Sequence, residues 1–248
     1  MDSTMPRATL CLLPLLALTG CDSGATYTSE SKIIIDGVEQ PSETATVQSD
    51  SLASTAPTTE PPRASLLFDG SSFAGWEGNL EIFRIQDGAI VGGTLNEKVA
   101  HNDFLTTTNQ YSDFELRLKF MLKGENTNAG IQIRSQRIDN PPHEMIGYQA
   151  DLGQQYWGCL YDESRRRKVL TGPDKAQLDK VLKREDWNDY RIRCEGKRIQ
   201  LWINDFQTVD YTEDDDTIQQ TGFIGLQIHG GPPGEAWYKD IEIEDLSK

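Results

Sequence analysis

The stretch at residues 147–152 places polar side chains at every second position of an otherwise apolar sequence. Gln149 and Asp151 alternate with Tyr148, Ala150 and Leu152. Alternate side chains of a β-strand share a face, so the amide and the acid point the same way. A carboxyl group can accept or donate a proton, and an amide beside it can hydrogen-bond a hydroxylated ligand. We therefore predict a catalytic role for Asp151 and a substrate-binding role for Gln149.

Two further stretches show the same alternation. Gln132 and Arg134 stand at alternate positions of one stretch, and Gln227 and His229 do so near the C-terminus. If the three strands form one concave sheet, its face presents one acid, one arginine, one histidine and three amides. We predict catalytic roles for Arg134 and His229 beside Asp151, and substrate-binding roles for both glutamines. The alternatives are a solvated or ion-paired strand surface and, for His229, a turn cap.

The segment that follows Asp151 adds aromatic and basic side chains. Trp157 and Tyr161 are suited to stack on a pyranose ring. Arg165 and Arg166 belong to a run of three arginines that follows directly. Such a run is normally a solvated charge cluster, but both are candidates to contact substrate or to pair with Asp151.

His143 and Glu144 lie in a proline-led loop that leads into the next strand. Both are candidates for substrate binding, although loop surface is the favoured interpretation. Asp151, His229 and Glu144 offer oxygen and nitrogen ligands for a divalent metal, but no fixed spacing supports a metal site. The acidic loop at 213–216 lacks the glycine spacing of a calcium loop. No glycine-rich nucleotide motif occurs, so the sequence requires no cofactor.

The elements that position these residues are predicted to be strands. Apolar and polar residues alternate along 114–122, and turn residues break 81–93 and 190–204 into hairpins. Only 174–185 has the spacing of a helix, with Leu178, Val181 and Leu182 on one stripe. Many short antiparallel strands with glycine turns predict an all-β protein with one short helix, either a β-sandwich of two antiparallel sheets or a barrel.

The N-terminal part is predicted to lie outside the folded domain. Residues 1–20 hold a short apolar run, and Leu18-Thr19-Gly20-Cys21 resembles the lipobox of bacterial lipoproteins. This predicts a signal peptide over 1–20, a lipid on Cys21 and a periplasmic or cell-surface protein tethered to a membrane; an ordinary signal peptide is the alternative. Residues 21–63, rich in Ser, Thr and Pro, are expected to form a disordered tether. The domain then covers 64–248.

The net charge bears on the choice of partner, and the cysteine content bears on disulfide bonding. The formal net charge is -15, with no long basic cluster beyond 165–168, which argues against nucleic acid. Cys11 would leave with the signal peptide and Cys21 is the lipid candidate, which leaves Cys159 and Cys194. Export permits a disulfide between them, but two buried thiols are the favoured interpretation.

A series of motifs over residues 65–246 resembles one bacterial family. The motifs are Leu67-Phe68-Asp69-Gly70, Gly75-Trp76, TTNQYSDF at 107–114, Asn128-Ala129-Gly130-Ile131-Gln132-Ile133-Arg134, Gly147-Tyr148, Trp187-Asn188, Ile203-Asn204-Asp205, Gly225-Leu226-Gln227-Ile228-His229 and KDIEIEDL at 239–246. The family is the 3-keto-disaccharide hydrolase, or 3-keto-glucoside-1,2-lyase/3-keto-2-hydroxy-glucal hydratase, domain. The resemblance implies a concanavalin A-like jelly roll.

The resemblance also implies a chemistry. A glycoside oxidised at C3 has an acidified C2 proton, so a base can start β-elimination, and hydration then completes net hydrolysis. A separate sugar dehydrogenase would supply the keto sugar. Many relatives carry glutamate where this chain has Gln149, so the base is assigned to Asp151.

Two other functions stay open on the same fold. A carbohydrate-binding, lectin-like module would need no base, and Gln149 favours it. A glucanase-like hydrolase of intact glycan ranks lowest, because no strand expected on the inner sheet carries two acids at alternate positions such as E-x-D-x-x-E.

Overall fold

The computed structural model describes residues 34–35, 38–39 and 64–247. The first of these form two short paired strands, β1 (Ile34–Ile35) and β2 (Val38–Glu39). The predicted signal peptide, Cys21 and most of the predicted tether lie outside the described residues. Among those described, no helix has the length and apolar character needed to cross a membrane.

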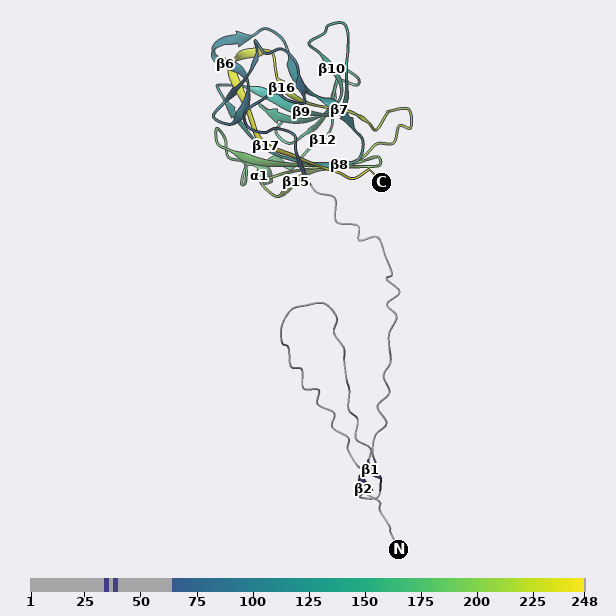
Figure 1. Ribbon diagram of the computed structural model, residues 1–248. Helices are drawn as coiled ribbons and strands as arrows, with labels where there is room; N and C mark the ends of the chain where they lie inside the picture. The colour runs from purple at the N-terminus through teal and green to yellow at the C-terminus, as the bar shows by residue number, and fades with distance from the viewer. Residues whose placement is uncertain (1–33, 36–37, 40–63, 248) are drawn as a thin grey trace. The chain divides into compact units, whose positions relative to one another are not determined.

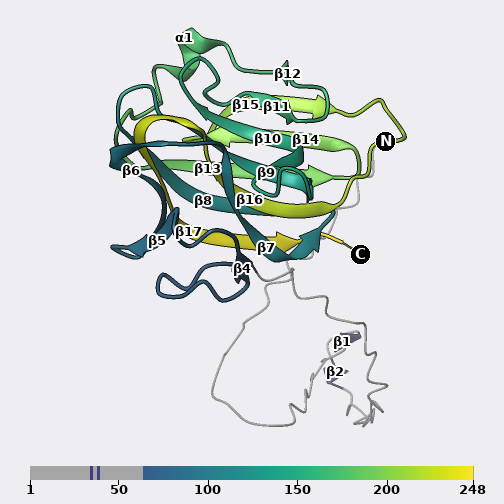
Figure 2. The same cartoon turned by 90° about the horizontal axis from the view of Figure 1, so that it is seen from above.

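The domain at 64–247 consists of two antiparallel sheets packed face to face (Figures 1 and 2). The seven-stranded sheet, called the site sheet below, runs in the order β12 (Lys168–Thr171), β11 (Leu160–Glu163), β10 (Met145–Gly153), β9 (Asn128–Arg137), β16 (Gly222–Ile228), β7 (Asp103–Tyr111) and β4 (Trp76–Glu77). The eight-stranded back sheet runs β15 (Phe206–Thr212), β14 (Arg198–Ile203), β13 (Asn188–Glu195), β8 (Phe114–Lys123), β17 (Gly231–Asp245), β6 (Ala89–Val99) and β5 (Phe83–Gln86), and β3 (Ser65–Leu66) pairs with β17.

The period-two pattern of the sequence places one face of each sheet in a shared core. Phe114, Leu116 and Leu118 of β8 lie in it with Tyr148 and Ala150 of β10. Burial of apolar area between two sheets is the main stabilising contribution in such a sandwich. The predicted all-β sandwich with one short helix is confirmed. Both Cys159 and Cys194 are buried and free, which confirms the thiol interpretation.

The helical segment is shorter than its pattern predicts. Helix α1 covers only Lys175–Leu178, where Asp174 caps the first turn by accepting a hydrogen bond from the Gln177 amide. Leu178 is buried, and Val181 and Leu182 pack against the core from a turn rather than from a helix. Four residues are too few to form a stable helix without tertiary contacts, so packing fixes this segment.

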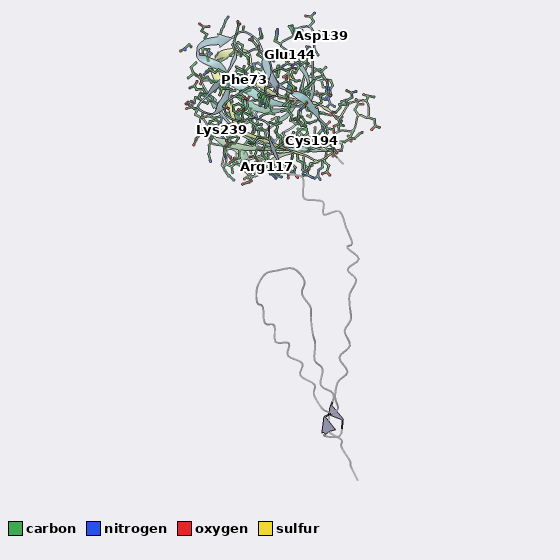
Figure 3. The ribbon with its side chains drawn as sticks, viewed as in Figure 1. Phe73, Arg117, Asp139, Glu144, Cys194 and Lys239 are labelled. Atoms are coloured by element: carbon green, nitrogen blue, oxygen red, sulfur yellow. The ribbon has the colours of Figure 1, made fainter. Side chains whose placement is uncertain are left out.

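The hairpin between β9 and β10 bends out of the site sheet and covers its outer face. Residues 136–146 form this segment, called the covering hairpin below. Gly147 has a φ of +147°, and a Cβ there would lie 2.3 Å from the Ser135 hydroxyl, so the bend requires glycine. Figure 3 shows Asp139 and Glu144 of the covering hairpin on one side of the domain and Arg117 of the back sheet on the other. The outer face of the site sheet is therefore covered rather than exposed.

Candidate functional site

The outer face of the site sheet is polar, yet it is almost completely buried. Gln132 and Gln227 are 0% exposed, Gln149 is 2% exposed and Asp151 is 3% exposed. All four point away from the apolar core between the sheets. This face is called the floor below. Polar groups in a sheet's outer face are usually solvated, so a buried set of amides and one acid needs a specific explanation.

The covering hairpin accounts for much of this burial. Its Met145 side chain lies over Gly225 of the floor, against Gln132 and Thr106. The Arg137 guanidinium donates hydrogen bonds to the Thr106 hydroxyl at 2.6 and 2.9 Å. These contacts join β9 and β10 to β7 across the floor, so the floor is closed to solvent in this conformation.

Two stacked histidine rings form a further contact at the outer face of the site sheet. The His143 ring of the covering hairpin stacks on His101, with ring centroids 3.7 Å apart and planes inclined by 17°. Both imidazoles lie near Asp103 at the start of β7. The ring of His143, a predicted substrate-binding residue, thus contacts His101 rather than the floor itself.

Gly130 makes room in the middle of the floor. It lies between Gln227 on one neighbouring strand and Asp151 on the other. A Cβ at Gly130 would lie 2.6 Å from the side-chain amide carbon of Gln149, so any larger residue would displace that amide. The glycine in the motif at 128–134 therefore positions Gln149.

A row of consecutive hydrogen bonds runs across the floor. The Ser135 hydroxyl donates to Gln132 Oε1 at 2.6 Å, and Gln132 Nε2 donates to Gln149 Oε1 at 2.8 Å. The remaining Gln149 amide group hydrogen-bonds the Asp151 carboxyl. An amide can accept from one side and donate to the other, whereas a carboxylate only accepts. The residue that departs from the family pattern, Gln149, thus has a defined place here.

Gln227 is the exception in this network. Both polar atoms of its side chain are buried, and neither has a hydrogen-bond partner among the described residues. Leaving a buried amide unpaired costs on the order of 1–3 kcal/mol per group. An unsatisfied amide that faces a polar floor is expected where a ligand completes the hydrogen bonds.

The carboxyl groups of the floor carry raised pKa values. Burial, and to a smaller extent Glu163, raise the pKa of Asp151 well above its usual range, while the Leu152 backbone amide opposes this. Burial and then the neighbouring Glu144 raise the pKa of Glu163 to about 7. A carboxyl group with such a pKa is a suitable proton acceptor or donor near neutral pH.

Glu163 was missed by the sequence reasoning, although a signal for it exists. It pairs with Gly147 in the sheet and stands two residues after Tyr161, so it shares the face of Gln149. Tyr161 is half-buried on this face and makes an edge contact with Tyr156. Tyr161 and Glu144, both predicted to bind substrate, thus lie near the floor, Glu144 through its proximity to Glu163.

Arg134 and His229 do not join Asp151, so the predicted convergence is not found. Arg134 has a φ of +50°, which breaks the alternation of β9, and its side chain is 0% exposed. It donates to the Ser112 and Gly196 carbonyls and pairs with Asp113, closing one end of the sandwich. The exposed His229 lies at the other end of β9, beside Gly230 and Asn128.

Trp157 and the two arginines also lie away from the floor. Trp157 packs on Phe120, and the Arg184 guanidinium lies 5.7 Å from its ring centroid. Arg165 and Arg166 both bond Asp162 and stack over the ring of Tyr148. Neither is paired with Asp151, because Asp162 faces the opposite side of β11.

Arg166 belongs to a buried ion-pair network at the edge of the sandwich. It bonds Asp162 and donates to Glu213 Oε2 at 2.7 Å, and the Tyr148 hydroxyl donates to the same oxygen at 2.6 Å. Burial opposes ionisation of Glu213, but these bonds together hold its pKa at about 2. The acidic loop that begins at Glu213 is thus engaged by an arginine. No described residues form a group of three ligands arranged to hold a metal ion.

The fold and floor define a class: a jelly-roll sandwich whose outer face on one sheet is polar and buried. The structures similar to it include a candidate glycosyl hydrolase from Parabacteroides distasonis ATCC 8503, with a TM-score of 0.56 and 18% identity over 74% of this chain and 94% of that one. The CBM66 carbohydrate-binding module of Bacillus subtilis has a TM-score of 0.53 and 15% identity over 69% and 96%. These identities establish the fold alone.

The family follows from the sequence. The model of the 3-keto-alpha-glucoside-1,2-lyase-like domain matches residues 63–244, and the chain belongs to this family. No curated protein matches the chain. The resemblance found in the ordered motifs, and the jelly-roll fold that it implies, are confirmed.

Proposed function

We propose that this domain cleaves 3-keto-glycosides on the floor of the site sheet. The observation that carries the proposal is the pairing of proton-active carboxyl groups, Asp151 and Glu163, with a row of buried amides that ends in the unpartnered Gln227. Family membership supplies the substrate class. Amides and acids on one face suit a sugar whose hydroxyls and carbonyl need hydrogen bonds and whose C2 proton must move.

The chemistry assigns a role to each group. Glu163, with its pKa near neutrality, takes the C2 proton as its carboxylate. The electron pair moves onto the C3 oxygen as an enolate, which the Gln227 amide stabilises by donating a hydrogen bond. The enolate then collapses, the bond from C1 to the aglycone oxygen breaks, and neutral Asp151 protonates the leaving oxygen. Water adds across the resulting double bond and completes hydrolysis.

Substrate entry requires the covering hairpin to move. The floor residues are at most 3% exposed, so a sugar cannot reach Asp151 while Met145 lies over Gly225. The contacts that hold the hairpin include the stacked His101 and His143 rings, the bonds of Arg137 and the buried Met145 side chain. Closure after entry would exclude water from the enolate.

The wider setting is part of the proposal. An exported protein with a lipid on Cys21 would hold the domain at a bacterial membrane. A separate sugar dehydrogenase would supply the keto sugar, because C3 oxidation needs a redox cofactor and the sequence contains no nucleotide-binding motif. Export is tested by labelling the full chain with a palmitate analogue: Cys21→Ala should remove the label, and an equal label on that variant contradicts the lipid site.

The direct test is turnover of a purified 3-keto-glucoside, followed by release of the aglycone. Asp151→Asn should lower kcat by roughly a hundredfold or more while binding of the keto sugar changes little. The matched control is Asp139→Asn, on the exposed tip of the covering hairpin. Absence of turnover with keto-glycosides, together with saturable binding of a glycan, would replace the enzyme by a binding module.

The binding module remains the second candidate because of one observation. Tyr161 is half-buried beside Gln149 and offers a ring for stacking against a sugar. If the domain is a binding module, Tyr161→Ala should lower glycan affinity. Asp151→Asn should then have no effect on turnover, because the domain would have none.

A further inference from the structure

A second hollow lies at the end of the sandwich near the base of the covering hairpin. Its volume is about 260 Å³. Gln136 and Ile146 contribute from the hairpin base, Ile218 and Gln219 from the segment before β16, and Arg165 from the turn after β11. A water molecule occupies roughly 30 Å³ in the liquid, so the hollow can hold a molecule of sugar size.

Arg165 is the feature that needs a ligand. Its hydrogen bonds run from Nε to both oxygens of Asp162, at 3.0 and 3.1 Å. Its Nη2 atom is buried and has no partner among the described residues. Arg166 bonds the same carboxylate, so Asp162 is shared between two guanidinium groups. The terminal nitrogens of Arg165 therefore form a donor fork without an acceptor, and such a fork fits an oxyanion.

The wall of the hollow contains no carboxylate. It is formed by two arginines, two glutamines, two threonines and two isoleucines. In a chain with a net charge of -15, an enclosure without acids is distinctive. Arg134 adds a fixed charge, but its own bonds are taken by Ser112, Gly196 and Asp113.

The remaining groups define the shape of a ligand. Gln219 is exposed, so its amide is available to donate. The Thr217 hydroxyl already donates to Asp215, so it acts as an acceptor at most. Ile146 and Ile218 supply an apolar wall that suits the carbon face of a ring. The set therefore fits a ring-bearing ligand with one oxyanion rather than an inorganic ion alone.

We infer that this hollow is a binding site for a small oxyanion-bearing sugar, with Arg165 as the principal anion ligand. The oxyanion can be the carboxylate of a uronic acid or a sulfate or phosphate ester, since all three present paired oxygens to a guanidinium. The site is separate from the floor and does not depend on the proposed reaction.

The experiment is titration of the purified domain, followed by NMR or calorimetry, with glucuronate, glucose 6-phosphate and glucose. We expect both anions to bind and glucose to bind at least about tenfold more weakly. Titration with inorganic sulfate tests an oxyanion without a sugar ring. If sulfate binds more weakly than the sugar anions, the result supports the role of the isoleucine wall.

Two variants test the residues. Arg165→Gln removes the donor fork while Asp162 keeps Arg166, and Gln219→Glu adds a negative charge to an exposed position without a change in shape. Each should weaken anion binding by about tenfold or more. Arg198→Gln, which removes an exposed arginine paired with Asp210 on β14, is the matched control and should bind as the wild type does. Anion affinity that neither variant changes, or equal affinity for glucose and glucuronate, overturns the assignment.

Discussion

Strands β10 and β11 carry two buried polar clusters on opposite faces, and the clusters differ in how their charges are balanced. On the inner and edge side, Asp162 and Glu213 are paired with Arg166, and the Tyr148 hydroxyl completes the bonds. On the floor, Asp151 and Glu163 face amides and another acid. The pKa of Glu213 is lowered to about 2, whereas that of Glu163 is raised to about 7.

The difference separates a structural network from a functional one. Carboxylates that are paired with arginines stay ionised, so they do not serve proton transfer, and the pairs lock two sheets at their edge. Carboxyl groups without a cation are destabilised when ionised, and such a cost is retained where proton transfer is needed. Both clusters arise from the alternation of side chains along the same two strands, because successive residues point to opposite faces of the sheet.

The largest effect should come from Glu163→Gln. Loss of the proposed base should lower kcat by roughly a hundredfold to ten-thousandfold, because an amide cannot take the C2 proton. In the wild type, kcat/KM should rise with pH through the pKa of Glu163, at about 7, and this dependence should disappear in the variant. Glu185→Gln, at an exposed position, is the control. A variant with full activity would assign the base elsewhere.

A disulfide across the closed floor tests access. His101→Cys combined with His143→Cys places two thiols where the stacked rings now lie. Oxidation should lower turnover by at least about tenfold, and reduction should restore it, because the covering hairpin can then no longer open. Unchanged turnover in the oxidised form, with the bond verified by mass spectrometry, would mean that substrate enters by another route.

Arg166→Gln tests the paired cluster and should act on stability instead. The change leaves buried Asp162 with Arg165 alone and removes the cation from Glu213, so the free energy of unfolding should fall by about 3 kcal/mol. Arg167→Gln, at the exposed neighbouring position, should change it by less than about 0.5 kcal/mol. Urea denaturation measures both, and equal effects would show that the run of arginines acts as a solvated cluster.

Much of the fold was predictable because it depends on alternation. The hairpin around Asp87-Gly88 and the strand at 114–122 appear as predicted, since burial of one face dictates them. The floor was predictable in part for the same reason, as Gln132, Gln149, Asp151 and Gln227 share it. Arg134 was misplaced because its left-handed backbone shifts the register of β9 by one, which no pattern of side chains reveals.

Long-range packing explains the remaining misses. Burial of the floor depends on a hairpin that bends at Gly147 and returns across β7, and nothing local to Gln227 indicates that cover. The pKa of Glu163 is raised by burial and then by Glu144, which reaches it from the covering hairpin, and the sequence shows neither effect. The pairing of Arg166 with Glu213 likewise joins residues far apart in sequence. The alternation of residues predicts which face of a strand a side chain occupies. The residues that a bent hairpin brings against that face can be identified only from the structure.

The smallest expected effect is a difference in the pH dependence of stability between the two clusters. Since the folded-state pKa of Glu163 is raised, its contribution is fully present below the usual glutamate pKa and is lost as pH rises through about 7. The folded-state pKa of Glu213 is lowered, so its contribution is present above the usual range and is lost as pH falls toward about 2.

Unfolding experiments between about pH 5 and about pH 8 should therefore find Glu163→Gln more stable than the wild type near the upper end of that range. The difference in the free energy of unfolding should be on the order of 1 kcal/mol after allowance for the partial exposure of Glu163. Glu213→Gln should be less stable than the wild type by nearly the same amount across this range, because the Glu213 carboxylate stays ionised and paired throughout it. If both variants follow parallel curves, the two clusters are not electrostatically distinct, and the assignment of proton transfer to the floor loses its physical basis.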